Sequence, residues 1–289
     1  MSFKIITDST VNLSPDYINK HDISVVNLFY LFDGVQHPAY NPERPNHYKE
    51  FYETMRTRPK VSTSCANQNQ YFEEFEKAVK CGLTVLYVGF SVGVSASYTC
   101  AENAKEQILK TYPNAQIYSI DTLTGSLGQG HFVKKAVEMR ESGICTKEVY
   151  EFIKRERMNL NTYVTVDDLF FLKQGGRISS LSYGLGKLIQ IKPIIKVSDE
   201  GKLVAVSKVV TRKQSLNAMF NVVKERIVSP ETSTVYISHG DCVDVADSLA
   251  KRFKEELGVK EVIIDFLEPV IGSHTGAGSI ALFFFGNGR

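Results

Sequence analysis

The sequence lacks tryptophan altogether and contains only five cysteines in 289 residues. The cysteines are odd in number, scattered and without a C-x-x-C pair, at positions 65, 81, 100, 145 and 242. A disulfide framework normally uses an even number of cysteines, and a structural zinc site uses closely spaced ligands. We therefore expect reduced thiols in a cytoplasmic protein and no metal site.

Long apolar runs and concentrations of basic residues are also missing. The longest apolar stretch, "SIALFFFG" at 279–286, has the length of a buried strand and is far shorter than a bilayer-spanning helix. Lys and Arg are spread along the chain with a formal net charge of +2, unlike the basic footprint of a nucleic-acid-binding protein. The start, "MSFKIITDST", lacks the charged and apolar segments of a signal peptide. These absences favour a globular protein with an ordinary core.

Apolar strands alternate with amphipathic helices over the first half of the chain. Strands are predicted at 3–7, 83–88 and 115–121, a hairpin at Asp33-Gly34, and helices from Pro15 and over 46–57, 69–82, 95–113 and 126–143. This order predicts a three-layer α/β domain with a largely parallel sheet. Later, a strand–turn–strand unit over 192–210 introduces antiparallel pairing, with helices over 212–227 and 245–257. We predict two α/β domains, 1–160 and 161–289, the second with a mixed sheet covered by helices.

Loops rich in hydroxyl groups and glycine follow several predicted strands. Because ligands bind beyond the carboxyl ends of strands in such sheets, the candidate binding loops are 7–10, 62–67, 89–97 and 121–130. A loop of this kind that opens a helix offers backbone N–H groups and hydroxyls to an anion. The hydroxyls of any single loop can be explained by helix capping, through Ser95, Ser97 or Ser126. The convergence of several such loops on one edge of the sheet favours a binding site instead.

The stretch "GFSVG" at 89–93 has the G-x-S-x-G spacing of a hydrolase nucleophile elbow. Ser91 would be the nucleophile, with Asp241 and His274 following in the order Ser, Asp, His. However, Gly93 and Val94 intervene before the helix begins at Ser95 or Ser97, whereas a true elbow turns directly from strand to helix, and no HGGG-like segment supplies an oxyanion hole. A serine hydrolase acting on lipid esters through Ser91 or Ser95 is the alternative function. A nucleotide-binding enzyme ranks below it, since neither a P-loop nor G-x-G-x-x-G is present.

Three other side chains stand out by their positions. In "LKQGGRISSL" at 172–181, two glycines end a short predicted helix and Arg177 projects from the loop that follows. Arg212 opens a predicted helix against the dipole preference, which suggests a use for its charge. His274 stands in "GSHTGAG", which is expected to be a loop, and is better placed than His239 and the other histidines to meet a ligand.

These strings, in this order, resemble the DegV family, the fatty-acid-binding subunits of bacterial fatty acid kinases. The resemblance spans almost the whole chain and rests on "TDSTVNL", "STS" at 62–64, "SVGVSASY", "DTLTGSLGQG", "LKQGGRIS", "IKPII" and "PVIGSHTGAG". It implies two domains that bury one long-chain fatty acid, with the carboxyl group at the domain junction and the tail in an apolar tunnel. The sequence departs from the usual family pattern at 64–67, 89–90, 268 and 277, which bears on the shape of the tunnel.

The resemblance also implies which residues hold the ligand. The family's carboxyl-binding Thr, Ser and His correspond to Thr63, Ser95 and His274. The chain would need no cofactor and do no chemistry itself, since a separate ATP-dependent kinase would phosphorylate the bound carboxyl group for phospholipid synthesis. Arg177 and Arg212 are expected to face that partner or the phosphate. No transmembrane segment is expected, and any membrane contact would be transient.

Overall fold

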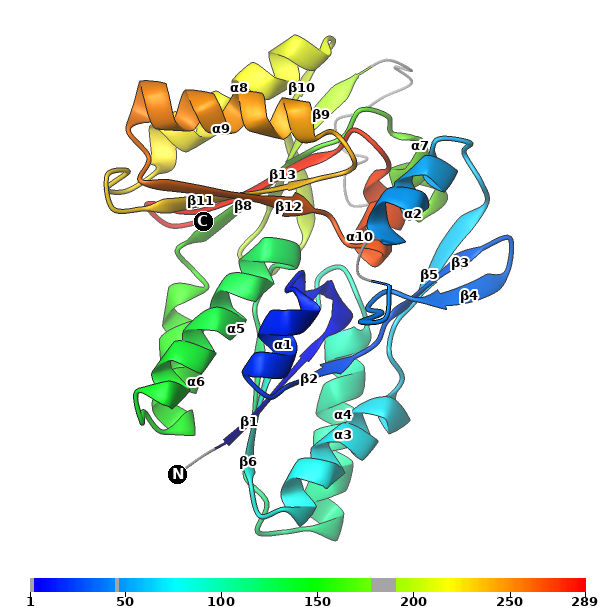
Figure 1. Cartoon of the computed structure of the whole chain (residues 1–289), viewed down its shortest axis with the longest axis vertical. Coiled ribbons are helices and arrows are strands. Elements are labelled where there is room, and N and C mark those ends of the chain that lie inside the picture. The colour runs from blue at the N-terminus through cyan, green and yellow to red at the C-terminus, as the bar shows by residue number, and fades with distance from the viewer. Residues whose placement is uncertain (1–2, 45–46, 178–190) are drawn as a thin grey trace.

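The computed structural model describes residues 3–44, 47–177 and 191–289, and within these ranges the strands form three sheets. The first is a four-stranded sheet in the order β2-β1-β6-β7, in which all neighbours are parallel. Its strands are β1 (Phe3–Asp8), β2 (Ile23–Val26), β6 (Thr84–Gly89) and β7 (Ile117–Asp121). The carboxyl ends of these strands point toward the centre of the molecule (Figure 1).

Helices cover both faces of this parallel sheet. On one face lie α3 (Gln68–Lys80) and α4 (Ser97–Thr111), and on the other lie α5 (Ser126–Glu141) and α6 (Thr146–Glu156). Successive strand residues point to opposite faces, so Ile5 packs with the α5–α6 side and Ile6 with the α3–α4 side. The predicted three-layer α/β arrangement is confirmed. The predicted start of α1 (Pro15–Lys20) is also confirmed, with Ser14 as its N-cap.

The second half of the chain builds a six-stranded mixed sheet in the order β10-β9-β8-β13-β11-β12. Its strands are β8 (Leu160–Thr165), β9 (Lys192–Val197), β10 (Leu203–Val209), β11 (Thr234–His239), β12 (Glu261–Phe266) and β13 (Ile280–Phe285). Only β11 and β12 run parallel to each other within this sheet as described. The predicted mixed sheet is confirmed. That the two halves are separate domains divided at residue 160 stays a prediction.

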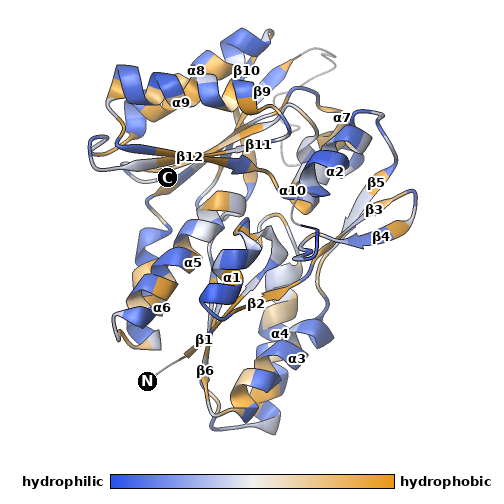
Figure 2. Cartoon of the chain, in the orientation of Figure 1, coloured by the Kyte–Doolittle hydropathy of each residue, from blue (hydrophilic) through white to orange (hydrophobic). Residues whose placement is uncertain are grey.

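The two faces of the six-stranded sheet have different neighbours. On the outer face pack α8 (Arg212–Arg226) and α9 (Val243–Leu257). These helices carry both hydrophilic and hydrophobic residues, as expected for helices with one buried face (Figure 2). On the inner face, Ala281 and Phe283 of β13 pack with α5. The inner face is therefore turned toward the loops of the parallel sheet.

A small antiparallel sheet, β4-β3-β5, carries one of the predicted binding segments. β3 (Phe29–Phe32) and β4 (Val35–Pro38) form the predicted hairpin, whose turn residues Asp33 and Gly34 have φ angles of 48° and 87°. β5 (Val61–Ser64) pairs with β3. The segment 62–67 was predicted as a loop after a parallel strand, and this is wrong because its first residues extend the hairpin instead. Beside this sheet lie α2 (His47–Met55), α7 (Phe170–Gln174) and α10 (Pro269–Thr275).

Candidate functional site

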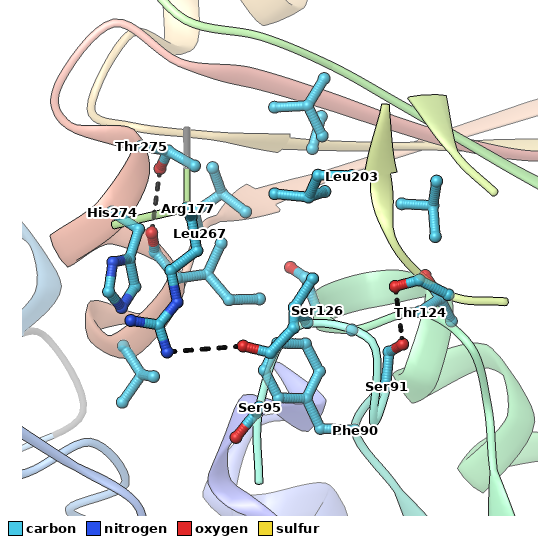
Figure 3. Close-up of a pocket in the computed structure, with 18 of the residues that line it drawn as sticks. Phe90, Ser91, Ser95, Thr124, Ser126, Arg177, Leu203, Leu267, His274 and Thr275 are labelled. Atoms are coloured by element: carbon cyan, nitrogen blue, oxygen red, sulfur yellow. Dashed lines mark hydrogen bonds between the residues drawn. The ribbon is translucent and has the colours of Figure 1, made fainter. Parts of the chain in front are cut away.

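A cavity of about 250 Å³ lies between the loops of the parallel sheet and the inner face of the six-stranded sheet. Its wall is mainly apolar, and includes Val164, Leu172, Ile195, Val197, Leu203, Val270, Ile271, Ala281 and Phe283. Of the five residues that the resemblance to the DegV family implies for the ligand or the partner, four line the cavity, namely Thr63, Ser95, Arg177 and His274. In Figure 3, His274 and Arg177 lie on one side of the cavity and Ser95 lies across from them.

Thr63 and His274 come from distant parts of the chain and meet in the cavity wall. The Thr63 Oγ1 lies 2.9 Å from the His274 Nε2. β5 supplies the threonine, and the short helix α10 supplies the histidine. The expectation that His274 stands in a loop is therefore wrong. Glu268 caps this helix by accepting hydrogen bonds from two backbone N–H groups, and Pro269 occupies its first position, which are ordinary signals of a helix start.

The environment of His274 keeps its ring neutral. Burial, followed by the nearby charge of Arg177, lowers the pKa of His274 to about 3. Among the described residues, no hydrogen-bond partner reaches its buried Nδ1. An unpaired buried N–H group is rarer than an unpaired acceptor, so we assign the ring proton to Nε2, which then donates to Thr63 Oγ1. This tautomer directs the Thr63 hydroxyl proton to another acceptor, such as a ligand oxygen.

The two glycine-rich segments of the sequence pack against each other around this histidine. A Cβ atom on Gly175 would lie 2.0 Å from the His274 Nδ1, so only glycine allows this close approach of the backbone. Gly276, with a φ of 76°, faces the Phe171 ring, and a Cβ there would lie 2.4 Å from a ring carbon. The glycines thus allow α7 and α10 to pack closely and hold the His274 ring in place.

Arg177 reaches across to the backbone just before Ser95 in the cavity wall. The Arg177 Nη1 donates to the Gly175 carbonyl at 2.7 Å, and its Nη2 reaches the Val94 carbonyl at 3.5 Å (Figure 3). Ser95 comes directly after that carbonyl, and its Oγ accepts a hydrogen bond of 3.2 Å from the Ser97 N–H. α4 begins at Ser97, so Ser95 precedes the helix rather than opening it. The guanidinium and Ser95 therefore line the same cavity as Thr63 and His274.

Ser91 is not arranged as a nucleophile. It is 1% exposed, and its hydroxyl donates to the Gly201 carbonyl at 2.9 Å. Asp241 pairs with Arg56 at 2.7 Å. In the described chain, no hydrogen bond joins His274 to Ser91 or Asp241. The structure therefore does not assemble the triad that the alternative hydrolase would need.

Arg212, the fifth of the residues that the resemblance implies, does not line the cavity as described. It opens α8 as predicted, and its Nη2 donates to the Gly278 carbonyl. Its Nη1 is buried without a partner within the described ranges. Arg212 thus binds the backbone just after α10 rather than the cavity. His239, the second-ranked histidine, accepts a hydrogen bond from the Cys242 N–H, and burial lowers its pKa.

Other hydroxyls of the cavity wall have hydrogen-bond partners within the protein. Thr124 Oγ1 lies 3.0 Å from Thr162 Oγ1, and Ser126 Oγ lies 2.9 Å from Ser238 Oγ. Paired hydroxyls need no ligand partner, so this part of the wall tolerates an apolar ligand. Sequence reasoning did not single out the apolar lining. The lining residues alternate along three strands, at positions 162 and 164, 195 and 197, and 281 and 283. This alternation identifies the residues that share one face of a strand, but it does not show whether that face borders a cavity.

Two other features, a metal-binding cluster and a membrane-spanning helix, are absent from the described residues. Within 3–44, 47–177 and 191–289, no group of three or more His, Cys, Asp or Glu side chains is placed to hold a metal ion. In the same ranges, no helix has the length and apolar character needed to cross a bilayer. The arrangement that the site does offer is a set of hydroxyl, imidazole and guanidinium groups beside an apolar cavity.

Known proteins resemble the chain over nearly its whole length. The family model described as "Uncharacterised protein, DegV family" matches residues 2–287. A DegV domain-containing protein of Clostridium perfringens is 38% identical over 285 residues, covering 99% of this chain and 98% of that protein. A DegV domain-containing protein of Streptococcus pyogenes serotype M1 is 32% identical over 288 residues, covering 99% of each.

Solved structures share the fold. A stearic-acid-binding protein from Eubacterium ventriosum has a TM-score of 0.86 and 25% identity, with 98% of each chain covered. A fatty acid binding DegV family protein from Streptococcus agalactiae has a TM-score of 0.85 and 26% identity, with 99% of each chain covered. With the family match over residues 2–287 and relatives more than 30% identical over full length, the chain belongs to the DegV family.

Proposed function

We propose that this protein binds one long-chain fatty acid in the cavity and holds its carboxyl group with Thr63, Ser95 and His274. The observation that carries the proposal is the Thr63–His274 pair, 2.9 Å apart, in the wall of a mainly apolar cavity. The fatty-acid-binding proteins from Eubacterium ventriosum and Streptococcus agalactiae, which share the fold, support the choice of ligand. The cavity then lies at the junction of two domains, 1–160 and 161–289.

The chemistry of the lining suits such a ligand. Each buried methylene contributes about 0.8 kcal/mol, so a long tail supplies ample affinity. The carboxyl group must keep hydrogen bonds where it leaves water, or the gain is reduced by several kcal/mol. The Thr63 and Ser95 hydroxyls provide these bonds, the neutral His274 ring orients the Thr63 hydroxyl, and the guanidinium of Arg177 supplies a positive charge beside them. The carboxyl group of the ligand thus keeps hydrogen bonds and a nearby positive charge, while the tail lies against Val164, Ile195 and Phe283.

We further propose that the protein presents this carboxyl group to a separate ATP-dependent kinase in the cytoplasm. The kinase would form the acyl phosphate for phospholipid synthesis, and this chain would contribute no catalysis. Arg177 lies beside the carboxyl-binding residues, so it would face the incoming phosphate. Arg212 lies outside the cavity and would help to position the segment after α10 toward the partner.

Extraction of lipid from the purified protein tests the proposed ligand. Organic extraction followed by mass spectrometry should recover about one long-chain fatty acid per chain. The Ser62→Ala variant, altered on the same strand but outside the cavity, should retain as much lipid as the wild type. Recovery of no stoichiometric fatty acid from any preparation contradicts the proposal. Labelling of Ser91 or Ser95 by a fluorophosphonate would instead favour the hydrolase.

A further inference from the structure

We propose that the tip of the β9–β10 hairpin, residues 198–202, is a gate through which the ligand enters the cavity, and that Ser91 and Arg289 are the positioning residues that hold it closed. This inference rests on the proposed function of the cavity as a fatty acid site. It also assigns a role to the serine of the G-x-S-x-G motif, which the proposed function leaves unused.

The hairpin tip forms part of the cavity wall. Val197, Gly201 and Leu203 line the cavity just before, at and just after the turn. Among the described strands, β10 stands at the edge of its sheet and pairs with β9 alone. The turn is closed by its own bonds, from the Ser198 N–H to the Lys202 carbonyl at 2.8 Å and from the Gly201 N–H to the Ser198 carbonyl at 2.9 Å. The tip can therefore swing as a unit without breaking its internal hydrogen bonds.

Ser91 makes the first attachment of this tip to the parallel-sheet half of the molecule. Its hydroxyl donates to the Gly201 carbonyl at 2.9 Å and accepts from the Gly93 N–H at 3.2 Å. The contact is close, since a Cβ on Gly93 would lie 2.4 Å from the Gly201 backbone and a Cβ on Gly201 would lie 2.1 Å from the Ser91 Oγ. The serine thus joins the loop after β6 to the tip by a buried hydrogen bond.

Arg289 makes the second attachment, and it bridges three segments. Its Nη1 donates to the Ser198 carbonyl at 3.0 Å, its Nη2 to the Leu123 carbonyl at 2.7 Å, and its Nε to the Leu160 carbonyl at 3.0 Å. Leu123 lies in the loop after β7, and Ser198 begins the hairpin turn. A guanidinium forms such fixed, charge-assisted bonds well. Arg289 therefore holds the hairpin tip against the loop that runs into α5.

These attachments are hydrogen bonds to backbone carbonyls, which can break and reform while the strands behind the tip stay paired. The tip itself is polar, with Asp199 and Glu200 exposed on its outer side. By contrast, β9 behind the tip pairs with β8, and β8 pairs in turn with β13. Opening at the tip is thus the least costly way to uncover the cavity from the side of this hairpin. A gate of this kind changes the barrier to exchange, while the closed state and its ligand contacts stay the same.

The rates of ligand exchange test the gate. We would measure association of cis-parinaric acid with delipidated protein by stopped-flow fluorescence, and its dissociation by transfer to excess phosphatidylcholine vesicles. Ser91→Ala and Arg289→Gln should each raise both rate constants by about fivefold, the factor expected for the net loss of a buried hydrogen bond. The Kd should change by less than about twofold, since a gate speeds both directions equally. Val204→Thr, at a position 41% exposed on β10, is the matched control and should exchange at the wild-type rate.

The outcomes separate the gate from the proposed function. If wild-type protein binds no cis-parinaric acid, the fatty acid site fails and the gate fails with it. If the wild type binds but both variants exchange at its rate, only the gate is overturned. If only the dissociation rate constant rises, and the Kd rises by the same factor, the hairpin tip is part of the cavity wall that contributes to affinity. That result also overturns the gate. Should Ser91→Ala fail to fold, Arg289→Gln decides the outcome, with Arg289→Lys expected to restore slow exchange in part.

Discussion

Replacing Thr63 by valine is the most informative change to the carboxyl site. Valine keeps the shape of threonine and the β-branched side chain that suits β5, so the strand should be preserved. It removes the hydroxyl that accepts from the His274 Nε2 at 2.9 Å and that would donate to the ligand carboxylate. A hydrogen bond to a charged group contributes about 1.5–3 kcal/mol. The affinity for a fatty acid should therefore fall by roughly 30-fold, which corresponds to about 2 kcal/mol.

The assay is equilibrium binding to delipidated protein, measured with a fatty acid and with its methyl ester. The ester keeps the tail but lacks the carboxylate, so Thr63→Val should weaken its binding by less than about fivefold. Ser62→Ala, on the neighbouring position of β5 and outside the cavity, should leave both affinities unchanged. In a double-mutant cycle with His274→Ala, the two losses should be less than additive because the two side chains act through one hydrogen bond.

Two results would refute this reasoning. A fatty acid affinity within twofold of the wild type would remove Thr63 from the carboxyl site. An equal loss for the acid and the ester would mean that the change acts on the tail or on the fold, and not on the carboxyl group. Circular dichroism and thermal unfolding of each variant would distinguish loss of structure from loss of a contact.

Further predictions concern pH and the glycine-rich segments. Folded His274 stays neutral down to a pKa of about 3, whereas the unfolded chain binds that proton below about 6.5, so stability should fall as the pH drops through this window. The urea midpoint of His274→Gln should fall less than that of the wild type from pH 7 to 4, and an equal fall would contradict the buried neutral ring. Burial raises the pKa of Glu268 to about 8, so the folded state keeps a proton that the unfolded chain releases near 4.5, and stability should decline as the pH rises between these values. Glu268→Gln should lessen that decline in thermal unfolding, and identical slopes would count against it. Gly175→Ala should displace the His274 ring and lower lipid retention severalfold, whereas Gly176→Ala, which meets open space at a φ of 69°, should cost about 1–2 kcal/mol of stability and keep its lipid. Equal lipid retention by the two alanine variants would argue against the close packing at Gly175.

The periodic parts of the fold could be read from the sequence, and its irregular parts could not. The alternation of strands and amphipathic helices predicts the three-layer half because one buried face per element is encoded locally. The hairpin at Asp33-Gly34 could also be predicted locally, because its turn needs positive φ angles and these two residue types adopt them readily. By contrast, β5 joins β3 in a separate sheet, and that pairing depends on tertiary contacts that no local pattern records.

The site shows the same division between local and long-range information. The resemblance to the DegV family pointed to Thr63, Ser95, Arg177 and His274, and the structure brings all four of these residues to one cavity. Spacing alone favoured Ser91, but its hydroxyl is used to hold Gly201, 110 residues away in the sequence. A hydrogen bond over that separation leaves no local signal.

The structure of the protein loaded with a saturated fatty acid tests the central claim most directly. A crystal structure should show a continuous acyl chain along the cavity, against Val164, Ile195 and Phe283. One carboxylate oxygen should lie within hydrogen-bond distance, about 3 Å, of the Thr63 Oγ1, with Ser95 and His274 beside it. A fatty acid bound in the reverse direction, with its methyl end at Thr63, or bound outside this cavity, would contradict the account.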